Sequence, residues 1–124
     1  MLKVLMFNIG GKKAVEIKMI CHKMRIPVQE VENDLFNCAI ESILGMSDSG
    51  KKRGEGSFDE EMLLFVNFNN VMLDIMLTQL RRKKCTVDLK AVLTDTNKSF
   101  TPIELCNELK AEREAIQKGR TAHT

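Results

Sequence analysis

The segment MLLFVNFNN, residues 62–70, decides the fold class. It begins as an almost continuously apolar run, which is typical of a strand that is covered on both faces. Asparagines follow, and residues 70–83 continue with the spacing of an amphipathic helix. A second apolar run, LKVLMF at residues 2–7, precedes a polar turn and another helical stretch at residues 12–24. The sequence therefore predicts two buried strands, each followed by a helix.

Two further strands and two further helices complete the predicted alternation. They are strands at residues 26–31 and 87–93 and helices at residues 34–44 and 102–118. Pro27 lacks a backbone N–H, and Asp88 and Lys90 place charges on one face of a strand, so both of these strands are predicted at the edges. We expect an α/β fold in three layers, with a four-stranded, mostly parallel sheet of order 2-1-3-4 and helices on both faces.

The two β-α-β-α halves align on each other. A shift of about 59 positions places Asn8 on Asn67 and Val28 on Val87, and it also superimposes the apolar stripes of the first and third helices. Any two β-α-β units obey the same patterning rules, so a true duplication and an independent likeness both remain open. The predicted organisation is one domain at 1–124, with halves at 1–45 and 61–118, a mobile loop at 46–60 and a disordered tail at 119–124.

The composition is that of a soluble globular protein. Apolar residues make up 44% and charged residues 29%, and the net charge of +2 is too small to indicate a nucleic-acid or anionic-membrane partner by itself. No apolar run approaches the roughly 18–20 residues of a membrane span. The N-terminal MLKVLMFNIGG has neither a basic leader nor a cleavage site. The four cysteines form no C-x-x-C pair, so we expect a cytoplasmic chain without a metal or cofactor.

A small-ligand site is predicted where the strand order reverses. In open parallel sheets this point lies beyond the carboxyl ends of the two central strands. The GGKK turn, Gly10–Lys13, opens a helix and suits phosphate, although it matches no phosphate-binding motif and two glycines make a plain turn more often than they bind phosphate. Asn69 or Asn70 can instead cap the following helix. The candidate ligand-binding residues are Asn8, Gly10, Gly11, Lys12, Asn67, Asn69 and Asn70, flanked by Thr94, Asp95 and Asn97.

Basic residues at two helix ends predict, more weakly, contact with nucleic acid. These residues are His22, Lys23, Arg25, Arg81, Arg82, Lys83 and Lys84. Cations at a helix C-terminus also complement the helix dipole, and the chain has no Trp or Tyr for base stacking. Cys21 and His22 point about 100° apart on a helix, so they do not form a nucleophile–base pair, and we assign no catalytic residues.

The segment FTPIEL, residues 100–105, has the pattern of a capping box. Thr101 is predicted as N-cap, Pro102 as the first helical residue and Glu104 as the partner three positions later. Phe100 and Leu105 occupy the positions of a hydrophobic staple.

Two stretches of the C-terminal half, LLFVNFNN at 63–70 and VDLKAVLTDTNKSFTPIELCNELKAE at 87–112, carry a family resemblance. Over about residues 62–114 the chain resembles a small bacterial family, the domain of unknown function 3783. That resemblance implies no activity. Because the sequence contains no recognisable nucleophile–base, metal or cofactor constellation, we expect a non-enzymatic cytoplasmic module that binds a protein or a small regulatory ligand. The alternatives are binding or processing of a phosphate-bearing small ligand and weak binding of nucleic acid.

Overall fold

The computed structural model describes residues 1–46 and 55–122, with side chains to residue 117. The chain divides into two compact units that interleave in sequence. The sheet unit comprises Met1–Glu32 and Asp59–Thr94, and the helical unit comprises Asn33–Phe58 and Asp95–Thr124 as far as they are described. No helix within the described ranges is long and apolar enough to cross a membrane.

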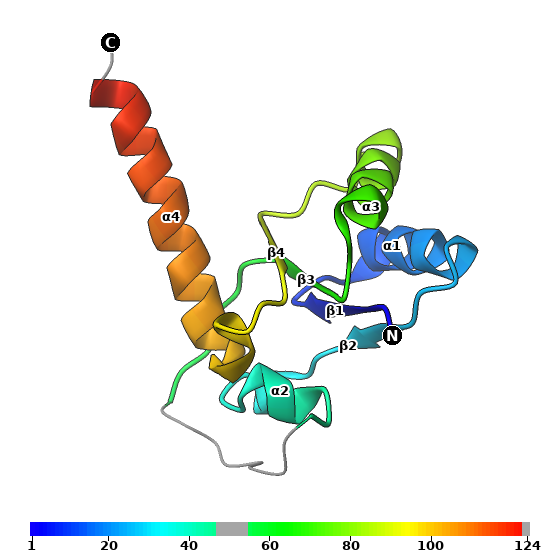
Figure 1. Ribbon diagram of the computed structural model, residues 1–124, viewed down its shortest axis with the longest axis horizontal. Helices are drawn as coiled ribbons and strands as arrows, with labels where there is room; N and C mark the ends of the chain where they lie inside the picture. Colours follow the sequence, from blue (N-terminus) through cyan, green and yellow to red (C-terminus); the bar gives the residue numbers. More distant parts are fainter. Residues whose placement is uncertain (47–54, 123–124) are drawn as a thin grey trace. The chain divides into compact units, whose positions relative to one another are not determined.

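The sheet unit contains two β-α-β segments (Figure 1). Its elements are β1 (Lys3–Phe7), α1 (Gly11–Lys23), β2 (Val28–Glu30), β3 (Met62–Val66), α3 (Asn70–Arg82) and β4 (Leu89–Val92). The strand order β2-β1-β3-β4 confirms the predicted order and the two edge strands. β1 pairs with β2 and β3 pairs with β4 in parallel, but β1 and β3 are antiparallel. The sheet is therefore mixed, and the prediction of a mostly parallel sheet is wrong.

The antiparallel centre also changes the placement of the helices. In the register, Val4 faces Phe65 and Leu5 faces Leu64, so the second β-α-β segment is turned end for end in the plane of the sheet. Such a rotation keeps the helix of each segment on the same face. Ile17 of α1 and Met76 of α3 accordingly belong to one core cluster with Val4 and Phe65, and the two helices contact each other. We had expected these two helices on opposite faces.

The central strands are buried on both faces, as their continuous apolar sequences predict. Leu5, Phe7 and Leu64 point away from the α1–α3 cluster, yet each has 0% exposure. Burial on two faces requires an apolar side chain at every position, which explains the absence of alternation in these strands.

Two left-handed backbone positions recur in both β-α-β segments, one after the first strand and one after the helix. Asn8 and Asn67, which follow β1 and β3, have φ values of 61° and 63°. Arg25 and Lys84, which follow α1 and α3, have φ values of 59° and 56°. In each helix, a chain reversal in the left-handed region ends the last turn.

After the helices, the residues of the two β-α-β segments no longer correspond at the same shift. Val28 pairs with Val4 in the sheet, whereas Val87 lies before β4 and Lys90 takes the matching place opposite Leu63. The predicted alignment of Val28 with Val87 is therefore not the alignment of the strands. A common origin of the two halves stays a prediction.

The helical unit departs further from the predicted elements. It contains a 3-10 turn η1 (Asn33–Leu35), the short α2 (Ile40–Ile43), a 3-10 turn η2 (Asn97–Ser99) and α4 (Pro102–Ala122). The predicted helix at 34–44 is wrong, because Ala39 has an extended backbone with φ −60° and ψ 140° that interrupts it. Helix α4 extends past the predicted end at residue 118 into the segment that we had expected to be disordered.

Aromatic and backbone contacts hold the helical unit together. The rings of Phe36 and Phe58 stack with centroids 4.5 Å apart, and Ser57 Oγ donates a hydrogen bond to Asn33 Oδ1 at 2.8 Å. The N–H of Ile40 donates to the carbonyl oxygen of Phe100 at 2.9 Å. Of the predicted mobile loop 46–60, residues 47–54 lie outside the described part, and Phe58 in the remainder is buried.

The capping box of α4 is confirmed. The N–H of Thr101 donates to Glu104 Oε1 at 2.9 Å, and the N–H of Glu104 donates to Thr101 Oγ1 at 3.1 Å. Thr101 is 2% exposed, and Leu105 at the expected staple position is 2% exposed. Two otherwise unpaired N–H groups at the helix start are thus satisfied inside the protein.

Candidate functional site

The two loops of the predicted switch-point site lie apart. Because β1 and β3 are antiparallel, Asn8 and Asn67 lie at opposite ends of the sheet. Asn8 Nδ2 donates to the carbonyl oxygen of Glu60 at 3.1 Å, and Asn67 Nδ2 donates to that of Met1 at 2.7 Å. Each side chain thus ties the end of one central strand to the chain entering the other, and the two loops form no common site.

The glycines of the first loop shape the start of α1. Gly10 is the N-cap and provides no side-chain hydrogen bond. Gly11 has φ +61°, in the left-handed region where a side chain is strained. Lys12, next in the chain, is exposed. These residues make a helix start without a polar side-chain cap.

Lys13 is a neighbour that the sequence did not single out. Its Nζ lies 2.6 Å from Glu61 Oε1 and donates to the carbonyl oxygen of Thr86 at 2.7 Å. The side chain therefore links the start of α1 to residues that precede β3 and β4 in the chain. The contact joins segments that are far apart in sequence, so spacing alone could not reveal it.

Asn69 caps the start of α3, which was the alternative interpretation of this residue in the sequence. Asn69 Oδ1 accepts a hydrogen bond from the N–H of Met72 at 2.8 Å, and Asn70 is the exposed first residue of α3. The flanking candidates Thr94, Asp95 and Asn97 fall in different units. Thr94 ends the sheet unit, whereas Asp95 and Asn97 belong to the helical unit. Asp95 is fully exposed at its carboxylate and lies 3.7 Å from Lys98 Nζ.

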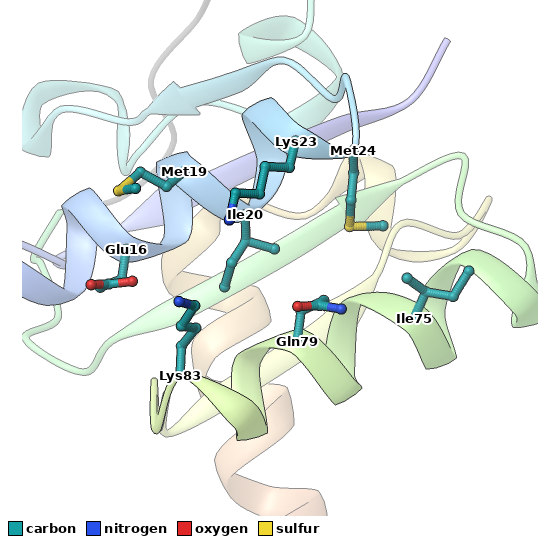
Figure 2. A pocket seen from close by; sticks show the side chains of 8 residues that line it. All are labelled: Glu16, Met19, Ile20, Lys23, Met24, Ile75, Gln79 and Lys83. Carbon is teal, nitrogen blue, oxygen red and sulfur yellow. The ribbon is translucent and has the colours of Figure 1, made fainter.

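The two basic helix ends also lie apart. Helices α1 and α3 run in opposite directions: Glu16 lies across from Lys83, and Met24 lies across from Ile75 (Figure 2). Residues His22, Lys23 and Arg25 end α1, and residues 81–84 end α3, so the two clusters occupy opposite ends of this helical layer. They do not form one continuous basic patch.

A groove lies between α1 and α3 in the sheet unit (Figure 2). Its volume is about 140 Å³. The lining residues are Glu16, Met19, Ile20, Lys23 and Met24 of α1 with Ile75, Gln79 and Lys83 from α3 and its end. Among them, Met19 is 50% exposed and Ile75 is 43% exposed. The groove therefore combines a buried floor with accessible apolar walls.

Charged groups collect at one end of this groove. Burial raises the pKa of the Cys85 thiol, the carboxylate of Glu16 raises it further, and the ammonium groups of Lys13 and Lys83 oppose that increase. All three charges therefore act on a single thiol. The Glu16–Lys83 end of the groove carries charges of both signs, whereas the Met24–Ile75 end combines apolar side chains with the ammonium group of Lys23.

The groove was missed in the sequence, although a signal was present. The buried stripes of α1 and α3 include Ile17 and Met76. Val15 and Met19 on α1, and Val71 and Ile75 on α3, lie off those stripes at i, i+4 spacing. Apolar residues that recur off the core stripe indicate a second apolar face, which folding alone does not require.

The described ranges contain no group of three or more His, Cys, Asp or Glu side chains that could hold a metal ion. The four cysteines are free and buried, and burial raises the pKa of Cys21 to about 11. A thiol that stays protonated at neutral pH is a poor nucleophile.

Comparison with known proteins agrees with the family resemblance. No curated protein and no solved structure matches the chain. Residues 61–116, from the residue before β3 into α4, match the model of one family. The family is described as Domain of unknown function (DUF3783), and its model covers the C-terminal half of the chain.

Proposed function

We propose that this protein is an interaction module that binds a segment of a partner protein on the face formed by α1 and α3. The observation that carries the proposal is the exposure of large apolar side chains. Val15, Met19, Val71 and Ile75 are 43–67% exposed, and all four lie on these two helices. In the rest of the described chain only Met1, Met46 and Ile116 are comparable. Clustered exposed apolar surface is typical of a protein-binding site.

The size of the groove supports a protein partner over a small molecule. Pockets for cofactors and drug-sized ligands usually enclose roughly 300–1,000 Å³. A groove of about 140 Å³ accommodates one or two side chains of a larger partner. Methionines such as Met19 and Met24 adapt their shape to an incoming side chain, because the thioether chain is unbranched and flexible.

The alternative of a phosphate-bearing ligand at the switch point lacks a supporting geometry, since Asn8 and Asn67 lie at opposite ends of the sheet. Nucleic-acid binding is less favoured than protein binding, because neither α1 nor α3 carries a Phe, Tyr or Trp side chain on which a base could stack. The free, buried cysteines support a location where thiols stay reduced, and we propose the cytoplasm.

The proposal is tested with a displayed library of random peptides selected against the intact protein. The affinity of enriched peptides is then measured by fluorescence anisotropy for the unmodified protein, for Ile75→Lys and for Ile116→Lys. Ile116 is a matched control, because it is an exposed apolar residue of α4 in the other unit. We expect Ile75→Lys to weaken binding at least tenfold and Ile116→Lys to leave it unchanged. Peptides that bind both variants equally, or a failure to enrich any peptide, would overturn the proposal.

A further inference from the structure

The groove has two chemically different ends, and this difference carries information about its occupant. At one end Glu16 and Lys83 face each other across the helices, and at the other end Met24 and Ile75 do so (Figure 2). Ile20 and Gln79 lie between them, and Met19 and Lys23 also line the α1 side. An occupant that contacts Lys83 at one end and Met24 with Ile75 at the other carries a charged group and an apolar group.

Corresponding positions of the two helices bear unlike side chains. The shift that superimposes α1 on α3 places Glu16 on Ile75 and Met24 on Lys83. The groove is thus nearly symmetric in backbone and asymmetric in chemistry. A second copy of the chain, docked face to face, would bring together two helical layers that both carry an excess of Lys and Arg side chains. A segment of a different, acidic protein therefore matches this face better than a second copy does.

The length of the groove sets the spacing of the two groups. Glu16 and Met24 are eight positions apart on one helix, as are Ile75 and Lys83 across its partner. At 1.5 Å per residue this spacing corresponds to about 12 Å. A helical segment lying along the groove spans that distance in about two turns, so side chains at positions i and i+7 reach both ends from one face.

The charge of the helical layer selects an acidic occupant. Residues 11–25 and 70–84 contain nine Lys and Arg side chains but only two acids, Glu16 and Asp74. The whole chain is nearly balanced, with 19 basic and 17 acidic residues, so the excess of positive charge is concentrated in these two segments. Lys83 is exposed at the polar end of the groove, next to Arg82 and Lys84. Complementary potentials favour an acidic partner and accelerate its association.

We infer that the occupant is an acidic, amphipathic helix of a partner protein. It places a large apolar side chain between Met24 and Ile75 and a carboxylate, about two turns away, against Lys83. This inference rests on the proposed function and adds to it the class and the orientation of the bound segment.

The inference is tested with synthetic helical peptides of about 16 residues that share an acidic, alanine-based host. One carries Leu at position i and Glu at i+7, a second carries Leu and Lys, and a third carries Ala and Glu. Affinities are measured for the unmodified protein, Lys83→Glu, Ile75→Lys and the control Lys98→Glu. Lys98 has a similar charge but lies in the helical unit.

We expect the Leu–Glu peptide to bind the unmodified protein about tenfold more tightly than either relative. Lys83→Glu reverses the preference toward the Leu–Lys peptide, Ile75→Lys weakens binding of every Leu peptide, and Lys98→Glu changes nothing. Binding that depends on Ile75 but is equal for the Leu–Glu and Leu–Lys peptides would refute the acidic orientation and leave the proposed function intact. Tighter binding of a short RNA or DNA duplex, lost with Lys83→Glu and kept with Ile75→Lys, would refute both.

Discussion

The capping box of α4 provides the sharpest test of the link between sequence and stability. Replacement of Thr101 by Ala removes the Oγ1 that accepts the Glu104 N–H at 3.1 Å. Loss of an N-cap side chain costs about 0.5–2 kcal/mol. Thr101 is 2% exposed, so water cannot easily replace the lost acceptor, and an unpaired buried N–H costs about 1–3 kcal/mol. We therefore expect a loss of about 2 kcal/mol in the free energy of unfolding.

For a chain of this length, about 2 kcal/mol corresponds to a decrease in Tm of about 8 °C. The assay is urea unfolding followed by far-UV circular dichroism, with the m value compared between variants to establish that the transition is of the same kind. Thr101→Ser keeps the hydroxyl and should recover most of the stability. Glu104→Gln keeps the side-chain acceptor for the Thr101 N–H and should be nearly neutral. An alanine variant within about 0.3 kcal/mol of the unmodified protein, or a serine variant as unstable as alanine, would refute the reasoning.

Three further predictions concern the sheet unit. Asn67→Ala loses the hydrogen bond to Met1 and strains the backbone at φ 63°, so the free energy of unfolding should fall by about 2 kcal/mol. Asn67→Gly loses the same hydrogen bond but relieves the strain, so it should cost about 1 kcal/mol, and Asn8→Ala should resemble Asn67→Ala. Equal costs for Asn67→Gly and Asn67→Ala in urea unfolding would contradict this prediction. The Cys21 pKa is raised from 9.0 to about 11, so the thiol ionises at lower pH in the unfolded chain than in the folded protein. The free energy of unfolding should therefore decrease as the pH rises from 9.0 to about 11, and that of Cys21→Ala should depend less on pH in this window. Met76→Ala removes a side chain with 0% exposure and should cost about 2–5 kcal/mol in the same assay.

Features that depend on residues close in sequence were predictable. The capping box joins Thr101 and Glu104, which are three positions apart, and the cap of α3 joins Asn69 and Met72 at the same spacing. In both cases the side chain and its backbone partner lie within one helical turn. The edge strands were recognised because Pro27 and the charges near Lys90 are themselves unsuited to a central strand.

The direction of the central strands was not predictable in this way. A buried strand has the same apolar sequence whether its neighbour runs parallel or antiparallel to it, and the long connection from β1 to β3 permits either direction. The predicted switch-point site required parallel central strands, so the antiparallel pairing also makes the prediction of that site wrong. The reciprocal hydrogen bonds of Asn8 and Asn67 link residues that are far apart in sequence, and each appears only once the antiparallel pair is known.

On α1 and α3, the buried side chains stabilise the fold, whereas we propose that the exposed apolar side chains bind a partner. At buried matching positions both helices carry apolar side chains, as Ile17 and Met76 do, because the sheet beneath requires them. On the outward side no such requirement acts, and an exposed Ile75 favours association with other molecules. Replacement of both Met19 and Ile75 by Lys should therefore change the free energy of unfolding by about 0.5 kcal/mol or less while removing peptide binding. A large loss of stability in urea unfolding would instead show that these two side chains serve the fold.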